Sequence, residues 1–356
     1  MKRGLRRWLW LGVSIVVVGL IFYNLSRSPE WRSFQWDQFW ATLTQARPGF
    51  LVAAVAVTSS SYFIRAYRWK LFLDSIKKAS LWVLFVAQVL GFSSIYLIGR
   101  PGEFVRPAYI AKKEEVSFTS QLALLLLERI YDAVFLILLL AVSLEFLRLE
   151  APSPRGASLV AWIHWTGRVM LLVSALLVAG VVVFRLRAAR LTASALRFFR
   201  FLPARALHYL ERFLTSFSDG LSVIRNWRTL FLSIASSAVL WALNATVFWF
   251  AFESLGGELE RLPWFAAAVV MFCAAQGLIF QLPGVGGGFQ VGALLALTQI
   301  FGVKAEAATG ASILVWILMS LPCLGLGLLL LLYEGLTLKK LSAIAEEERT
   351  AVRGKA

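Results

Sequence analysis

Long apolar runs alternate with short polar stretches along most of the 356-residue chain. Several runs approach or exceed 20 residues, the length that a helix needs to cross about 30 Å of hydrocarbon. Such runs are typical of membrane-spanning helices, so the pattern predicts an all-α polytopic membrane protein. The runs cover approximately residues 8–24, 49–67, 81–98, 117–146, 159–184, 229–252, 264–282, 289–303 and 308–333.

The composition agrees with the pattern. Hydrophobic residues make up 59% of the chain and charged residues only 16%, too few for the surface of a soluble domain of this size. The net charge of +16 could indicate nucleic-acid binding. Membrane proteins, however, concentrate lysine and arginine in cytoplasmic loops, so we interpret the excess as topogenic charge and expect no nucleic-acid partner.

The distribution of basic residues argues against every run being a full crossing. With a cytoplasmic N-terminus, full crossings would place Arg106 and the basic stretch 185–228 outside, against the positive-inside rule. If 81–98 and 102–113 instead form a re-entrant hairpin, the inside stretches hold 27 basic and 10 acidic residues, against 6 of each outside. Arg65 and Arg68 then count as cytoplasmic flanking charges. We therefore predict six full transmembrane helices plus two re-entrant helical hairpins, in a bacterial inner membrane with both termini cytoplasmic.

This arrangement contains an internal repeat. The Pro-Gly turns at 101–102 and 283–284 begin 52 and 54 residues after the start of their units, and the two units enter the membrane from opposite faces. Inverted repeats with broken helices are the architecture of many transporters. The predicted regions are an N-terminal anchor helix and external loop (1–48), a first repeat with a cytoplasmic-side hairpin (49–146), a linker helix and amphipathic inner-leaflet region (147–228), a second repeat with an external-side hairpin (229–335) and a cytoplasmic tail (336–356).

The first hairpin turn reads GRPGEFVRP and carries Arg100, Glu103 and Arg106. Non-helical backbone at membrane depth persists only when it is buried in protein or lines a wet cavity. Broken helix ends also leave amides and carbonyls for a ligand. The alternative is a shallow cytoplasmic loop.

A second charged group, Glu128, Arg129 and Asp132, lies inside the apolar run 117–146. Charges within a span are costly, and they are functional or form structural ion pairs facing the protein interior. Glu128 and Asp132 are one helical turn apart on one face. We expect Arg100 or Arg106 to contact Glu128 or Asp132, directly or through one water.

The second hairpin turn reads LPGVGGGFQ, and its candidate ligand-contacting residues are Pro283, Gly284, Gly286, Gly287 and Gln290. Glycine allows close backbone approach to a ligand. The chain has no G-x-x-x-x-G-K-[ST] phosphate loop. Its two histidines, His164 and His208, lack partners at metal-ligand spacing. We therefore expect no metal, no cofactor and no enzymatic activity.

These motifs resemble the flippase-like transmembrane region of lysylphosphatidylglycerol synthase and its stand-alone relatives, over roughly residues 45–335. The matching residues in the first half are Pro101, Gly102, Glu103 and Arg106, then Glu128, Arg129 and Asp132. The chain departs from that family at Gln290, where relatives usually have glutamate, and its first turn lacks residues between Gly102 and Glu103.

The resemblance implies movement of a phospholipid or polyisoprenyl-linked lipid between leaflets, and not synthesis, because the sequence does not include the aminoacyl-transfer domain. Arg100 and Arg106 would bind phosphate, while Glu103, Glu128 and Asp132 would balance them and could carry a proton. Two alternatives remain open. One is a structural or accessory membrane subunit, and the other is a membrane-embedded enzyme that uses Glu128 and Asp132 as acid and base on lipid headgroups.

Overall fold

The regular structure of the described residues is helical, apart from one pair of two-residue strands. Apart from residue 19, the expected anchor helix lies outside the residues that the structure describes, as do most of 148–186 and the tail after residue 333. The computed structural model describes residues 19, 34–74, 76–147, 165, 167–169, 171–176, 178–180, 183–184, 187–201, 203–220, 227–278, 281–282 and 286–333.

In the described part, three helices are long and apolar enough to cross a membrane: α4 (Pro48–Leu73), α11 (Trp227–Leu255) and α14 (Ala305–Tyr333). Their outer faces leave large apolar side chains exposed, such as Leu321 at 63% and Leu332 at 72%. Apolar surface of this extent is unfavourable in water and favourable in hydrocarbon. The chain is therefore a membrane protein.

Helix α7 (Phe118–Phe146) is as long as α11, with 29 residues, but it carries charged residues near its middle. It begins after Ser117, whose Oγ accepts a hydrogen bond from the backbone N–H of Ser120 at 3.1 Å. This contact satisfies one of the amides that a helix start leaves unpaired.

In the first half of the chain, two short helices double back between α4 and α7. Helix α5 (Leu81–Ile98) has the bounds that the sequence predicts, and the 3₁₀ helix η1 (Arg100–Phe104) and α6 (Val105–Lys113) follow it. The reversal begins at Gly99, whose φ of 73° favours glycine. Gly102 then packs tightly on α5, since a Cβ there would lie 2.3 Å from the carbonyl carbon of Ser94.

The second half repeats this order between α11 and α14. Helix α12 (Trp264–Gly277) ends before the predicted boundary at residue 282, and residues 281–282 form a strand instead. The elements that follow are β1 (Gln281–Leu282), β2 (Gly286–Gly287), α13 (Gly288–Leu295) and the π-helical turn η4 (Ala296–Ile300). Strand pairing is antiparallel, with Gln281 opposite Gly287. Helices α12 and α13 also meet through glycine, because a Cβ on Gly292 would lie 2.4 Å from the carbonyl oxygen of Cys273.

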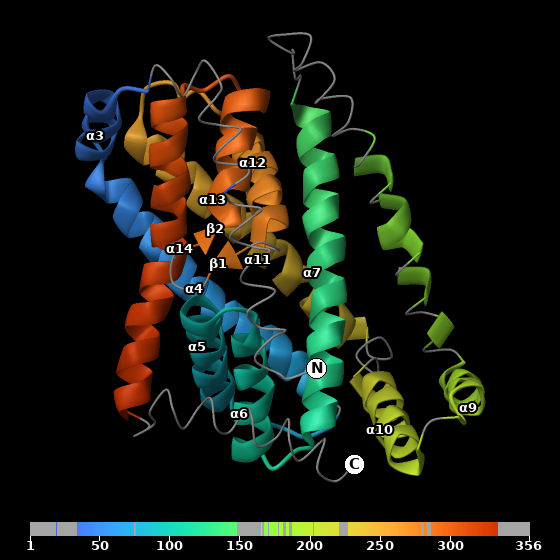
Figure 1. Ribbon diagram of the computed structural model, residues 1–356. Helices are drawn as coiled ribbons and strands as arrows, with labels where there is room; N and C mark the ends of the chain where they lie inside the picture. Colours follow the sequence, from blue (N-terminus) through green and yellow to red (C-terminus); the bar gives the residue numbers. More distant parts are fainter. Residues whose placement is uncertain are drawn as a thin grey trace.

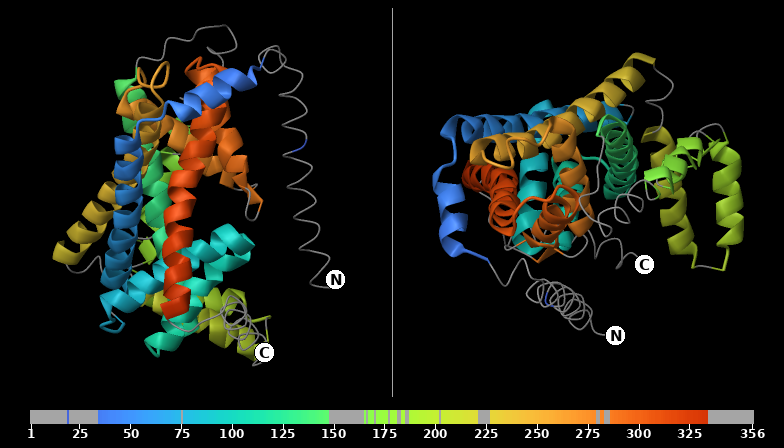
Figure 2. Two further views of the ribbon diagram at one scale, coloured as in Figure 1. Left: turned by 90° about the vertical axis from the view of Figure 1, so that its left-hand side faces the viewer. Right: turned by 90° about the horizontal axis from the view of Figure 1, so that it is seen from above.

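The two short pairs occupy opposite ends of the bundle, with α5 and α6 at the lower end and α12 and α13 at the upper end (Figures 1 and 2). The long helices run between them, and α4 packs along α11. Each pair has its own apolar core. Fully buried members include Trp69, Phe72, Leu84 and Leu124 around α5, and Phe248, Phe252, Val270 and Leu297 around α12.

Three shorter helices lie at the edges of the bundle. Helix α3 (Trp36–Thr44) sits at the upper end near the start of α14, where the backbone N–H of Gln35 donates to Glu306 Oε1 at 2.9 Å. Helices α9 (Ala188–Phe198) and α10 (Ala204–Gly220) lie at the lower end, and α10 packs against α7 (Figure 1). Within the predicted amphipathic region, Phe198 and Phe201 are 72% exposed.

Candidate functional site

Six charged residues from four elements of the first half meet inside the bundle. Helix α4 supplies one arginine, η1 a glutamate, α6 an arginine, and α7 two carboxylates and an arginine. We call this set the charge cluster: Arg68, Glu103, Arg106, Glu128, Arg129 and Asp132. Its three arginines and three carboxylates balance in formal charge.

Glu128 is the centre of the charge cluster. Its side chain is 1% exposed and contacts all three arginines. Oε1 accepts from Arg68 Nη2 at 2.8 Å, and Oε2 accepts from Arg106 Nη2 and from Arg129 Nη2, the latter at 3.2 Å. A buried carboxylate is tolerable only with such partners, since removing it from water alone costs several kcal/mol.

Arg68 joins three long helices. Its side chain is fully buried, and Nη2 lies 2.8 Å from Asp132 Oδ1 as well as from Glu128. Nη1 donates to Ser237 Oγ on α11 at 3.1 Å. The interpretation of Arg68 as a cytoplasmic flanking charge is wrong, because α4 continues past it to Leu73 and buries it.

Arg106 fastens the short helices to the cluster. Nη1 donates to Gln88 Oε1 on α5 at 2.6 Å, and its guanidinium carbon lies 4.2 Å from the centroid of the Trp69 ring. Gly91 on α5 makes room for it, since a Cβ there would lie 2.7 Å from the Cβ of Arg106. The expected contact between a turn arginine and an α7 carboxylate is therefore present as Arg106 with Glu128.

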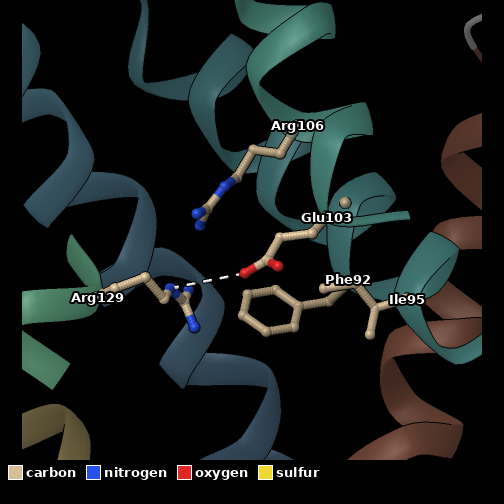
Figure 3. Close-up of a pocket in the computed structure, with 6 residues that line it drawn as sticks. Phe92, Ile95, Glu103, Arg106 and Arg129 are labelled. Atoms are coloured by element: carbon tan, nitrogen blue, oxygen red, sulfur yellow. Dashed lines mark ion pairs between the residues drawn. The ribbon is translucent and has the colours of Figure 1, made fainter. Parts of the chain in front are cut away.

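The outer side of the cluster is looser than its centre. The side chains of Arg129 and Glu103 are 44% and 32% exposed, and Arg129 Nε lies 3.8 Å from Glu103 Oε1 (Figure 3). Arg129 Nη2 lies 3.7 Å from Asp132 Oδ2. Both distances exceed that of a hydrogen bond, so this pair is held less firmly than Arg68 with Glu128.

A small pocket opens beside this outer pair. Its cavity volume is about 10 Å³, which is the lower limit for one water molecule. In Figure 3, the side chains of Arg106 and Glu103 project into the space above the Phe92 ring, and Arg129 reaches it from α7. The lining residues are Gly91, Phe92, Ile95, Glu103, Arg106 and Arg129. A phosphate group therefore enters only if the side chains move apart.

The remaining predicted residues fall into two groups. Arg100 belongs to η1, but its side chain, like Pro283 and Gly284, lies outside the described residues. In the second hairpin, Gln290 Oε1 accepts from the backbone N–H of Gly287 at 2.7 Å, and Gly286 pairs with Leu282. Gln290 thus stabilises the turn of its own hairpin, and a role for these residues in ligand binding stays a prediction.

Sequence reasoning missed Gln88 and Ser237, and it gave Arg68 no part in the site. A signal for Arg68 existed, because Ala54, Ser61 and Arg68 are spaced by seven residues and so share one buried face of α4. A single glutamine or serine in an apolar helix gives no such pattern. Only the packing of α5 and α11 against the cluster identifies Gln88 and Ser237 as parts of it.

The chain matches a known family along most of its length. The family model described as lysylphosphatidylglycerol synthase TM region matches residues 9–327, which include both halves and the whole charge cluster. None of the curated proteins matches the chain.

Proposed function

Because the chain belongs to the lysylphosphatidylglycerol synthase TM region family, we propose that it moves an anionic phospholipid, or a lipid-linked polar headgroup, between the leaflets of a bacterial inner membrane. The observation that carries the proposal is the charge cluster, buried among long apolar helices. A headgroup that crosses about 30 Å of hydrocarbon needs polar partners on its way, while its acyl chains can stay in lipid.

The proposed path uses both pairs of short helices as re-entrant hairpins. The order long helix, short pair, long helix occurs twice, and the pairs point toward each other from opposite ends (Figure 1). We interpret the halves as an inverted repeat, with the charge cluster at the cytoplasmic-side hairpin and both termini cytoplasmic. Two hairpins entering from opposite leaflets shorten the polar path to the distance between their turns.

Within the cluster, we assign different roles to the inner and outer pairs. The inner contacts of Glu128 with Arg68 and Arg106 hold α4, α6 and α7 together. The outer pair of Arg129 with Glu103 is partly exposed and separated by 3.8 Å. An incoming phosphate would displace the Glu103 carboxylate from Arg129, bind the planar guanidinium with two hydrogen bonds, and widen the pocket as Glu103 turns away.

Leaflet exchange in liposomes tests the proposal. The full-length protein is reconstituted with fluorescent phosphatidylglycerol, and a membrane-impermeant quencher reports how fast inner-leaflet lipid becomes accessible. We expect faster exchange than in empty vesicles. Exchange no faster than in empty vesicles, for phosphatidylglycerol and several other lipid classes, would contradict the proposal.

The same assay separates transport from a purely structural role. Glu103→Gln and Asp132→Asn remove charge while keeping side-chain shape. If both variants fold and exchange lipid as the wild type does, the charges serve only to hold helices together. Reduced exchange in a folded variant supports participation of the charges in the path.

A further inference from the structure

Arg65 lies on α4 three residues before Arg68, but its electrostatic surroundings differ. Within the described ranges, no carboxylate lies within 4.0 Å of Arg65 and its side chain makes no hydrogen bond. Its guanidinium carbon instead lies 4.8 Å from the centroid of the Phe92 ring, a cation–π contact. The charge cluster is balanced in formal charge without it, so Arg65 adds one positive charge without a paired carboxylate, and Asp132 and Glu128 act on it only from beyond 4.0 Å.

The position of Arg65 beside the pocket is well defined. Gln88 Nε2 donates to the backbone carbonyl of Arg65 at 3.4 Å, while Oε1 of the same glutamine holds Arg106 at 2.6 Å. Phe92, one turn further along α5, lies against both guanidinium groups, since the Arg106 carbon is 6.0 Å from the ring centroid. The same ring lines the pocket with Glu103 and Arg129. The Phe92 side chain therefore contacts Arg65 and lines the pocket, so Arg65 lies next to the pocket.

A cation inside a membrane-spanning helix is costly unless an opposite charge accompanies it. The face of the Phe92 ring offsets this cost only in part, because an aromatic ring stabilises a cation less than an anion does. Arg65 is also half-buried, whereas Arg68 is fully buried. Of the two arginines, Arg65 is therefore the more accessible.

We propose that Arg65 binds the phosphate of the transported lipid. When no lipid is bound, the Phe92 ring contacts the guanidinium where the phosphate would bind. This inference rests on the proposed function and adds Arg65 to Arg129 as a second arginine of its phosphate-binding site. A phosphodiester carries one negative charge, which matches the one unmatched charge of Arg65. The planar guanidinium can donate two parallel hydrogen bonds to it, which a lysine cannot.

Ligand-induced thermal stabilisation tests the site. The full-length protein in an uncharged detergent is titrated with dioleoyl phosphatidylglycerol, with phosphate-free dioleoylglycerol, and with inorganic phosphate at constant ionic strength. We expect phosphatidylglycerol to raise the unfolding midpoint by at least ~2 °C, and dioleoylglycerol to leave it unchanged. A comparable rise with inorganic phosphate alone would support a phosphate site at Arg65 and identify its ligand as a soluble anion.

The variants are Arg65→Gln, Arg65→Lys and a matched control, Arg47→Gln. Arg47 directly precedes the first residue of α4 and also packs on a phenylalanine, with its guanidinium carbon 5.1 Å from the Phe50 centroid. Unlike Arg65, it pairs with a carboxylate, that of Glu260 at 3.1 Å. We expect Arg65→Gln to fold with an unchanged midpoint and to lose the phosphatidylglycerol shift. Arg65→Lys should keep part of the shift, and Arg47→Gln should keep all of it.

A full shift in both Arg65 variants would overturn the inference, as would the absence of any shift in the wild type. These results are distinguishable from failure of the proposed function. Rapid lipid exchange with an intact shift in Arg65→Gln would remove only the assignment of Arg65. A shift that depends on Arg65, without lipid exchange in vesicles, would leave an anion site and remove the transport function.

Discussion

Each half of the molecule folds a pair of short helices through glycine contacts, but the residues around the two turns differ. In the first half, Gly102 packs against α5 and the turn is surrounded by the charge cluster. In the second half, Gly292 packs against α12, and the described polar contact at the turn is between the neutral Gln290 and Gly287. The comparison separates a packing device that both halves need from a charged site that the first half alone carries in the described residues.

The difference indicates that the two halves would contribute differently to the proposed path. If charges were needed merely to hold a short pair between long helices, the second half would need them as well. It forms a comparable pair with an apolar core that includes Phe248 and Leu297. The charges of the first half are therefore available for a ligand as well as for structure, and the predictions below test this separation.

Removal of Glu128 should have the largest effect. Glu128→Ala leaves Arg68 and Arg106 buried without their shared carboxylate, and we expect a loss of about 3–5 kcal/mol in unfolding free energy. Glu145→Ala, at an exposed position on the same helix, is the matched control and should change little. Thermal unfolding in detergent measures both. Equal stability of the two variants would show that the cluster contributes nothing to the fold.

Added methyl groups at the two packing glycines should have similar, intermediate effects. A Cβ would lie 2.3 Å from the carbonyl carbon of Ser94 in Gly102→Ala and 2.4 Å from the carbonyl oxygen of Cys273 in Gly292→Ala. Backbone atoms cannot rotate away, so each variant should lose about 1–3 kcal/mol or more.

Gly325→Ala is the control for this pair, because a Cβ there meets nothing within 4 Å. It should be neutral or slightly stabilising. Unfolding midpoints of the three variants in one detergent give the comparison. If Gly102→Ala or Gly292→Ala is as stable as the control, the two halves do not share this packing device.

A smaller effect is expected at the second turn. Gln290→Ala removes the acceptor of the 2.7 Å hydrogen bond from the Gly287 N–H and should cost about 1 kcal/mol. Thermal unfolding again provides the measurement. A loss as large as that of Glu128→Ala would mean that the second turn is as important for the fold as the charge cluster.

The smallest effect on stability is expected for Glu103→Gln. The ion pair with Arg129 spans 3.8 Å between partly exposed side chains, so its loss should change the unfolding free energy by no more than ~0.5 kcal/mol. The unfolding midpoint of this variant should therefore match that of the wild type. A destabilisation comparable to that of Glu128→Ala would place Glu103 in the structural centre and remove the distinction between inner and outer pairs.

Much of the fold follows from the apolar pattern. The bounds of α5 are predicted to the residue, and those of α7 and α11 to within three residues. The early end of α12 is not predicted, because residues 278–280 remain apolar and the pairing of residues 281–282 with Gly286 and Gly287 is not visible in the apolar pattern. Helix α4 is predicted too short, because arginine at the end of an apolar run usually indicates the membrane surface.

The site is predictable where charges stand out against apolar neighbours. Glu128, Arg129 and Asp132 are recognisable in this way, and the contact of Arg106 with Glu128 follows from the need to pair them. The participation of Arg68 in the charge cluster depends on how α4 packs across α7 and α11. The spacing of residues along one helix does not determine this packing. Headgroup binding by the residues predicted for it stays a prediction, and these are Arg100, Glu103, Arg106, Glu128, Arg129 and Asp132.

Lipid exchange by Arg129→Gln compared with Gln290→Ala tests the central claim most directly. Both substitutions remove polar contacts at a hairpin turn, one charged and partly exposed in the first half, the other neutral in the second. We predict that Arg129→Gln slows exchange of fluorescent phosphatidylglycerol about tenfold, as expected for loss of one charge-assisted hydrogen bond to the headgroup, and that Gln290→Ala stays within about twofold of wild type. Equal rates for both folded variants, or a slower rate for Gln290→Ala, would contradict the assignment of headgroup movement to the charged half.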